Sequence, residues 1–125
     1  IHDLSAGGAD PHPDGIQIAV GRNLLIENNA IVLNGDMTSA IISHRTDLNG
    51  VMIRHNLLGG GAHALYCPRE RSGDVHVIGK RFSTRHYPKA GAYGPWTDCE
   101  EVAELRDNVW DSTGIPLPGE PIQQR

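Results

Sequence analysis

Four segments of the chain repeat one pattern, in which an apolar stretch, a polar turn and a second apolar stretch follow one another. The segments are LLIENNAI (24–31), VMIRHNLL (51–58), VHVIGKRF (75–82) and AELRDNVW (103–110). Superposing them aligns one polar turn position, at steps of 27, 24 and 28 residues: Asn29, Asn56, Lys80 and Asn108. Two apolar columns flank it: Ile26, Ile53, Val77 and Leu105, and Ile31, Leu58, Phe82 and Trp110.

A second motif keeps the same period. DGIQI (14–18) aligns with SAIIS (39–43), ALYC (64–67) and AYGP (92–95). This alignment superposes four further residues at steps of 25, 24 and 28: Ile16, Ile41, Leu65 and Tyr93. Because two independent motifs recur with one period, the repeat indicates a structural unit that stacks along the chain.

The local pattern within each unit favours β-strands. Each unit holds two or three short alternating or β-rich stretches separated by Gly, Asn and Asp turns. No segment before residue 98 shows a sustained 3.6-residue apolar stripe, which argues against helical repeats. We therefore predict an all-β fold, a right-handed parallel β-helix of about four coils of 24–28 residues, in which identical positions of successive coils stack.

The asparagine column has an expected role in this fold. A turn asparagine can adopt the left-handed conformation and can hydrogen-bond along the stack. Lys80 stands where the other three units have asparagine, so we expect the ladder to be interrupted there.

The repeat also predicts domain boundaries. The coils occupy residues 1–113, and the Pro-rich residues 114–125 form a cap or tail, because proline does not pair as a central strand. Residues 98–111 could be interpreted as a short helix, but the alignment assigns residues 102–110 to a last coil.

The start of the sequence falls inside a coil. Ile1 lies 30 residues before Ile31, where the last strand of a preceding coil would lie. We therefore expect the chain to be the C-terminal part of a longer β-helix. Because an open end exposes strand edges and core, we expect more chain or a partner subunit, in a homo-oligomer or larger assembly, to cover the N-terminal end.

Charge argues against two classes of partner. The formal net charge is −4 at pH 7, the two lysines are Lys80 and Lys89, and no basic stripe is present. Nucleic acid and anionic membrane surfaces are therefore not expected as partners. No apolar run approaches the roughly 18 residues of a membrane helix, so no membrane insertion is expected. Cys67 and Cys99 can form one disulfide or remain two separate buried thiols, and the sequence leaves both open.

Several stretches resemble a known superfamily. IHDL (1–4), HPDGIQI (12–18), NLLIENNAI (23–31), TSAIIS (38–43) and VMIRHNLLGGGAHALY (51–66) resemble the right-handed parallel β-helix proteins of the pectate-lyase-like superfamily. RFSTRHYPKAGAYGPWTD (81–98) and RDNVWDSTGIPL (106–117) are similar to the C-terminal ends of actinobacterial and phage-associated surface β-helix proteins. The resemblance covers residues 1–113. It implies this fold and extracellular, cell-surface or virion work on polysaccharide, and it leaves the activity open because the superfamily includes lyases, hydrolases, epimerases, tailspikes and scaffolds.

His12 and Asp14 form a candidate acid/base pair. The proline between them keeps the backbone extended, so their side chains point to the same side. With Asp3 and Asp10 near in sequence, an acidic cluster there could bind Ca²⁺, the one cofactor that the sequence suggests. The alternative interpretation is structural: Asp14 forms an Asx-type turn before Gly15, and His12 covers it.

Gln17 begins a candidate sugar-binding column. It alternates outward between two core isoleucines, and the stacked positions of the next coils are Ile42 and Tyr66, followed by Gly94. An exposed Tyr66 can stack on a pyranose face. Packing against another subunit or domain is the alternative, because Ile42 makes this face apolar.

A basic group of candidates lies beside that column. His44 and Arg45 follow the strand of the second coil, and Arg69 and Arg71 project from the loop 68–74. The arginines can clamp uronate carboxylates through bidentate hydrogen bonds, and Arg45 could act as the base of a lyase, a third catalytic candidate. The alternative is a solvated loop whose own carboxylates balance the charge.

The remaining histidines and aromatic residues give weaker hypotheses. His55 and His76 have no partner at metal-ligand spacing, so no metal site is predicted from them. His63 follows three glycines, a flexible bend that a ligand could approach. The aromatic loop 86–98 is expected to fold back as a lid with Tyr93 in the inward column, and sugar stacking is the alternative.

These patterns support three hypotheses of different classes. The first is a surface or phage-tail β-helix module that recognises polysaccharide. The second is a lyase or glycoside hydrolase that cuts acidic polysaccharide. The absence of an acidic or basic column that repeats on one face argues against catalysis, but the sequence leaves the question open. The third is a purely structural segment of a surface or tail assembly.

Overall fold

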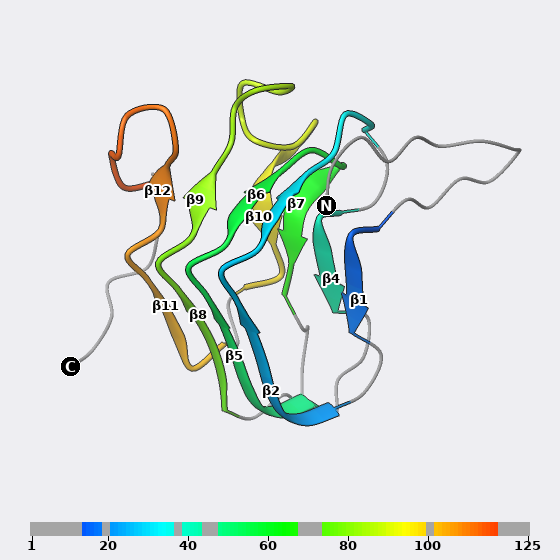
Figure 1. Cartoon of the computed structure of the whole chain (residues 1–125), viewed down its shortest axis with the longest axis vertical. Coiled ribbons are helices and arrows are strands. Elements are labelled where there is room, and N and C mark those ends of the chain that lie inside the picture. The colour runs from blue at the N-terminus through cyan, green and yellow to red at the C-terminus, as the bar shows by residue number, and fades with distance from the viewer. Residues whose placement is uncertain are drawn as a thin grey trace, which may run out of the picture.

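The computed structural model describes residues 14–18, 21–36, 39–43, 48–67, 74–99 and 102–117, which form twelve β-strands and no helix (Figure 1). The first sheet contains β1 (Ile16–Ile18), β4 (Ile41–Ser43), β7 (His63–Tyr66) and β10 (Gly94–Thr97). The second contains β2 (Gly21–Glu27), β5 (Leu48–Arg54), β8 (Val75–Ile78) and β11 (Glu104–Arg106). The third contains β3 (Ala30–Val32), β6 (Leu57–Gly59), β9 (Arg81–Phe82) and β12 (Val109–Trp110). A search of the described residues for a helix able to span a membrane finds none.

Each of the first nine strands, β1 to β9, pairs in parallel with the strand three places later in the chain. Three consecutive strands therefore make one repeat, and four repeats stack to give three four-stranded sheets. Figure 1 shows this stacking most clearly where β2, β5, β8 and β11 lie side by side. The expectation of an all-β fold built from stacked, parallel repeats is confirmed.

The two apolar columns from the first motif are stacked in register. Ile26, Ile53, Val77 and Leu105 are successive partners in the second sheet, and Ile31, Leu58, Phe82 and Trp110 in the third. Ile31, Leu58 and Phe82 have no exposed surface. The alternating pattern therefore forms the core between the sheets, because alternate side chains of a strand point to the same face.

The fourth member of the first-sheet column differs from the sequence alignment. Trp96, not Tyr93, pairs with Leu65, and Gly94 pairs with His63. Trp96 packs edge-on against Phe82, with ring centroids 5.6 Å apart. Tyr93 is 75% exposed, so the prediction that it turns inward as part of a lid is wrong. The longer connection before β10 shifts the register by three residues, which a fixed period could not reveal.

A two-residue turn joins each second-sheet strand to its third-sheet strand. The first residue of each turn has a positive φ: Asn28 (60°), His55 (55°), Gly79 (63°) and Asp107 (58°). The asparagine column occupies the second position, and its members are not among the positive-φ residues. The expected left-handed conformation of that column is therefore wrong, because the preceding residue makes the turn.

The asparagine column does hydrogen-bond along the stack. Asn56 Oδ1 accepts the main-chain N–H of Asn29 at 2.9 Å, and Asn56 Nδ2 donates to the carbonyl of Ile26 at 3.0 Å. The Asn56 amide thus accepts from the preceding repeat through its oxygen and donates to it through its nitrogen. Asn108 Oδ1 likewise accepts the N–H of Lys80 at 2.9 Å.

Lys80 interrupts only half of this ladder. Its fully buried side chain donates through Nζ to the carbonyl of Ile53, the residue stacked on Ile26, and to the carbonyl of Ile78 at 3.2 Å. In the third repeat, Lys80 therefore donates to the preceding repeat as Asn56 does in the second repeat. The acceptor role is lost, because a lysine side chain has no carbonyl oxygen.

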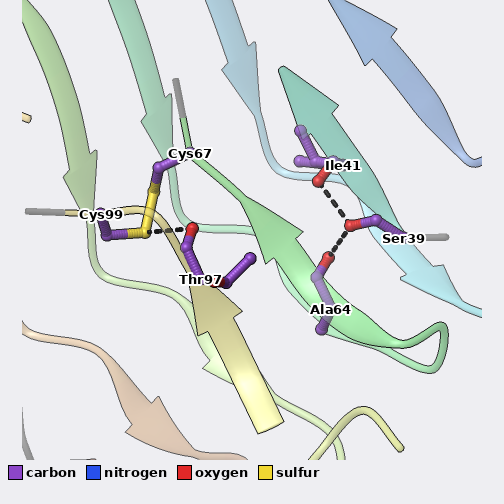
Figure 2. The surroundings of a disulfide bond; sticks show 6 residues. All are labelled: Ser39, Ile41, Ala64, Cys67, Thr97 and Cys99. Atoms are coloured by element: carbon purple, nitrogen blue, oxygen red, sulfur yellow. Dashed lines mark hydrogen bonds between the residues drawn. A yellow bond between two sulfur atoms is a disulfide. The ribbon is translucent and has the colours of Figure 1, made fainter. Parts of the chain in front are cut away.

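A disulfide ties the third repeat to the fourth. Cys67 follows β7, Cys99 follows β10, and their Cα atoms are 4.9 Å apart (Figure 2). The main-chain N–H of Cys67 also donates to the carbonyl of Thr97 at 3.0 Å. Of the two alternatives that the sequence left open, the structure has the bonded one, and both cysteines are buried.

The last repeat is made of strands and is covered by the chain that follows it. β11 and β12 occupy the segment for which a short helix was the alternative. Residues 111–117 turn back, so that Pro116 bridges Val109 and the N–H of Leu117 donates to the carbonyl of Asn108 at 3.1 Å. Leu117 is 3% exposed and belongs to the core. Residues 118–125 lie outside the described residues, so the extent of a Pro-rich cap or tail stays a prediction.

Candidate ligand-binding face

The outer face of the first sheet carries the predicted sugar-binding column. Gln17, Ile42 and Tyr66 are partners in successive strands, and the next residue in the column is Thr97, not Gly94. Gln17 is exposed, and Tyr66 and Thr97 are partly buried. Ile42 is only 5% exposed, so it does not provide the apolar outer surface that the sequence suggested.

Three rings form a row beside this column, which we call the aromatic row: Tyr93, His63 and Tyr66. The ring centroids of His63 and Tyr66 are 5.4 Å apart in an edge-on arrangement. Those of His63 and Tyr93 are 6.1 Å apart and tilted by 40°. The row thus joins the most exposed large apolar side chain of the described residues to the predicted Tyr66 platform.

The backbone under the aromatic row is fixed by close packing. The N–H groups of Ala92 and Tyr93 donate to the carbonyls of Gly61 and Ala62 at 2.9 and 2.8 Å. Gly60 has a φ of +86°, and a Cβ there would lie 2.0 Å from the carbonyl oxygen of Leu33. The three glycines before His63 are therefore buried against neighbouring backbone, so the approach for a ligand that the sequence suggested is not open at the glycines themselves.

Burial favours the neutral form of His63. Burial lowers its pKa, and the charge of Asp98 opposes this shift without cancelling it. Its Nδ1 is buried and has no hydrogen-bond partner among the described residues. A neutral ring between two tyrosines presents an aromatic surface without a formal charge, which suits contact with uncharged C–H groups.

Little of the predicted catalytic and basic set can be placed. His12, His44, Arg45, Arg69 and Arg71 lie outside the described residues, so the acid/base pair and the uronate clamp stay predictions.

Asp14 is described, and it is partly buried beside Gly15 at the start of β1. Its Oδ1 atom is buried without a hydrogen-bond partner among the described residues. Gly15 packs tightly, because a Cβ there would lie 2.4 Å from Ile31 Cγ2. These contacts locate Asp14 at the strand entry and assign it no chemical role.

A charged network on the second sheet was missed from the sequence. His76 Nε2 lies 2.6 Å from Asp74 Oδ1, and His76 Nδ1 contacts Glu104 Oε1. Arg106 Nε donates to the second oxygen of Glu104 at 2.8 Å, and Arg106 Nη1 donates to Asp107 at 2.6 Å. Both ring nitrogens face carboxylates, which accept only, so this geometry requires the imidazolium form.

The pKa of His76 agrees with this assignment. Burial lowers its pKa, but the hydrogen bonds and charges of Asp74 and Glu104 together outweigh burial and raise it. The repeat alignment already placed Glu104 opposite His76, and their pairing in β8 and β11 is the signal that could have revealed the network. We infer that the network joins the third and fourth repeats.

A metal site is not evident in the described part of the chain, where no three His, Cys, Asp or Glu side chains are grouped to hold an ion. Comparison with protein-family models, curated proteins and solved structures gives no match.

Proposed function

We propose that the chain is part of a right-handed parallel β-helix. The support is the pairing of each of β1 to β9 with the strand three places later, always in parallel. Crossovers between parallel strands of one sheet are right-handed in about 98% of cases, which favours that hand. Three strands per coil then correspond to the repeat of 24–28 residues in the sequence.

We infer that this module recognises polysaccharide through the outer face of the first sheet. The observation that carries the proposal is the aromatic row, in which the exposed Tyr93 ring lies against His63 and the His63 ring lies against Tyr66. The apolar face of a pyranose can pack on such rings, and Gln17 and Thr97 supply polar groups beside them. A stacked sheet gives an extended face, which suits a polymer better than a single sugar.

An extracellular, cell-surface or virion location goes with this function. Disulfides persist in oxidising environments, and the buried Cys67–Cys99 bond is compatible with such a location. Phage-tail membership rests on the sequence resemblance alone. The lyase or hydrolase alternative rests on His12, Asp14 and Arg45, of which the structure describes only Asp14.

Binding to a glycan array, followed by titration calorimetry with the best polysaccharide, tests the proposal. Tyr93→Ala is expected to weaken binding at least tenfold, a loss of about 1.4 kcal/mol. Ile115→Ala is the matched control, because Ile115 is also an exposed apolar residue, at 59%, but lies in the segment after β12. Equal effects of the two substitutions, or no glycan binding by the unaltered chain, would contradict the proposal.

A further inference from the structure

We propose that Asn34 is a site of spontaneous modification, at which its side-chain amide reacts with the main-chain nitrogen of Gly35 and leaves an isoaspartate in the backbone. The other reactant is water. This inference is independent of polysaccharide binding, because it concerns a bend in the connection between β3 and β4.

The sequence contains two Asn-Gly pairs, Asn34–Gly35 and Asn49–Gly50. A glycine after an asparagine leaves the attacking nitrogen accessible, because glycine has no Cβ. The structure separates the two pairs. Gly50 lies within β5, which pairs with β2 and β8, and a Cβ there would lie 2.8 Å from Asn23 Oδ1. The backbone of the second pair is therefore held in a sheet and crowded, which opposes ring closure.

The first pair lies outside the strands and is open. Asn34 is exposed, and it forms a bend with Gly35 and Asp36 that follows β3. A Cβ on Gly35 would have no neighbouring atom within 4 Å. The N–H of Gly35 donates to no group in the described part of the chain. The nitrogen can therefore approach the Asn34 side chain without breaking a hydrogen bond or displacing a neighbour.

The reaction needs only these groups and water. The main-chain nitrogen of Gly35 attacks Cγ of Asn34, and the bond between Cγ and Nδ2 breaks. Nδ2 leaves as ammonia with the proton from the Gly35 nitrogen, and a succinimide ring remains. Water then opens the ring at one of its two carbonyls. Opening at Cγ gives an ordinary aspartate, and opening at the former main-chain carbonyl gives isoaspartate, without oxidation or reduction.

The product alters a bend that contacts two later segments of the chain. The carbonyl of Gly35 accepts the N–H of Gly61 at 2.8 Å, and the Tyr87 hydroxyl donates to the carbonyl of Asn34 at 3.5 Å. In isoaspartate the main chain passes through Cγ and is one carbon longer, and the former carbonyl carbon of Asn34 carries a free carboxylate. We therefore expect the hydrogen bond to Gly61, which precedes His63 of the aromatic row, to weaken.

Incubation of the folded, unaltered chain in mildly alkaline buffer tests the proposal, because base removes the proton from the attacking nitrogen. Peptide mapping by mass spectrometry detects the exchange of an amide for an acid, and isoaspartyl methyltransferase labels the isoaspartate. We expect the peptide with Asn34 to acquire both marks before the peptide with Asn49. The same incubation in urea should bring the two Asn-Gly pairs to similar rates, since unfolding removes the structural difference between them.

Two substitutions and a matched control isolate the reaction. Gly35→Ala adds a Cβ in open space beside the attacking nitrogen, and Asn34→Gln lengthens the side chain that must close the ring. Each should abolish the isoaspartate label at position 34. Gly114→Ala, at another glycine with open surroundings, should leave that label unchanged. Equal rates at Asn34 and Asn49 in the folded chain, or a label at position 34 that survives Gly35→Ala, would overturn the inference.

Discussion

The buried lysine in the asparagine ladder gives the most quantitative prediction. Lys80 has no exposed surface, and burial lowers its pKa from 10.5 to about 6. A neutral amine can donate to the carbonyls of Ile53 and Ile78, so the folded state prefers Lys80 without its proton. The unfolded chain keeps that proton up to about pH 10.5.

The sign of the pH dependence follows from this difference. Between pH 6 and 10.5 the unfolded state binds one more proton at Lys80 than the folded state, so stability rises with pH. Each pH unit is worth about 1.4 kcal/mol, so the free energy of unfolding should rise by about 3 kcal/mol between pH 7 and 9. Below pH 6 Lys80 carries its proton in both states. The free energy of unfolding is then about 6 kcal/mol lower than above pH 10.5.

Two substitutions isolate this contribution. Lys80→Met keeps much of the side-chain volume but has no titrating group, and it should lose the rise that Lys80 causes. Lys80→Asn restores the residue found at positions 29, 56 and 108, and should be more stable than the unaltered chain at pH 7, where removing the Lys80 proton costs about 5 kcal/mol. Urea unfolding at pH 7, 8 and 9, followed by the fluorescence of Trp96 and Trp110, gives the free energies. If the unaltered chain and Lys80→Met show equal pH dependence, Lys80 is charged in the fold and the reasoning is refuted.

Three further predictions concern the contacts that hold the repeats together. Replacing Cys67 and Cys99 by serine removes a disulfide that spans 32 residues and should lower the free energy of unfolding by about 3–4 kcal/mol. Urea unfolding measures this loss, and a loss under about 1 kcal/mol would contradict the prediction. Gly60→Ala should be several kcal/mol more destabilising than Gly114→Ala, because both glycines have a positive φ but only Gly60 lies against neighbouring backbone. Similar melting temperatures for the two variants would show that backbone strain, not this close contact, dominates. His76→Asn should lower the free energy of unfolding most below pH 6.5, where the His76 imidazolium is held by Asp74 and Glu104. This loss should vanish as the pH rises through the raised pKa of His76 in the folded state. A loss that is constant with pH would contradict a charged His76 in this network.

The sequence predicted the stacking well because repeated positions carry redundant information. The Ile26 and Ile31 columns each have four members, and every one is in the expected register. Tyr93 was misplaced because its motif rested on one aromatic residue in a connection of altered length. Burial then selected Trp96 for the core, where it packs on Phe82.

The candidate site was less accessible to sequence reasoning. Periodicity identified Gln17, Ile42 and Tyr66 as one column, since alternation along a strand assigns faces. It could not show that Ile42 is buried or that His63 joins Tyr66 to Tyr93, because such contacts depend on connections between strands. The same limit hid the role of Lys80. Its long side chain reaches the carbonyl of Ile53, which is equivalent to the Ile26 carbonyl that Asn56 reaches.

Titration of the isotopically labelled, unaltered chain with an array-selected oligosaccharide tests the functional account most directly. Amide chemical shifts report which residues a ligand touches. We expect the shifts to cluster at Gln17, Tyr66 and Thr97 on the outer face of the first sheet, and at His63 and Tyr93 in the aromatic row beside them. Shifts confined to the second or third sheet, or none at saturating ligand, would contradict it.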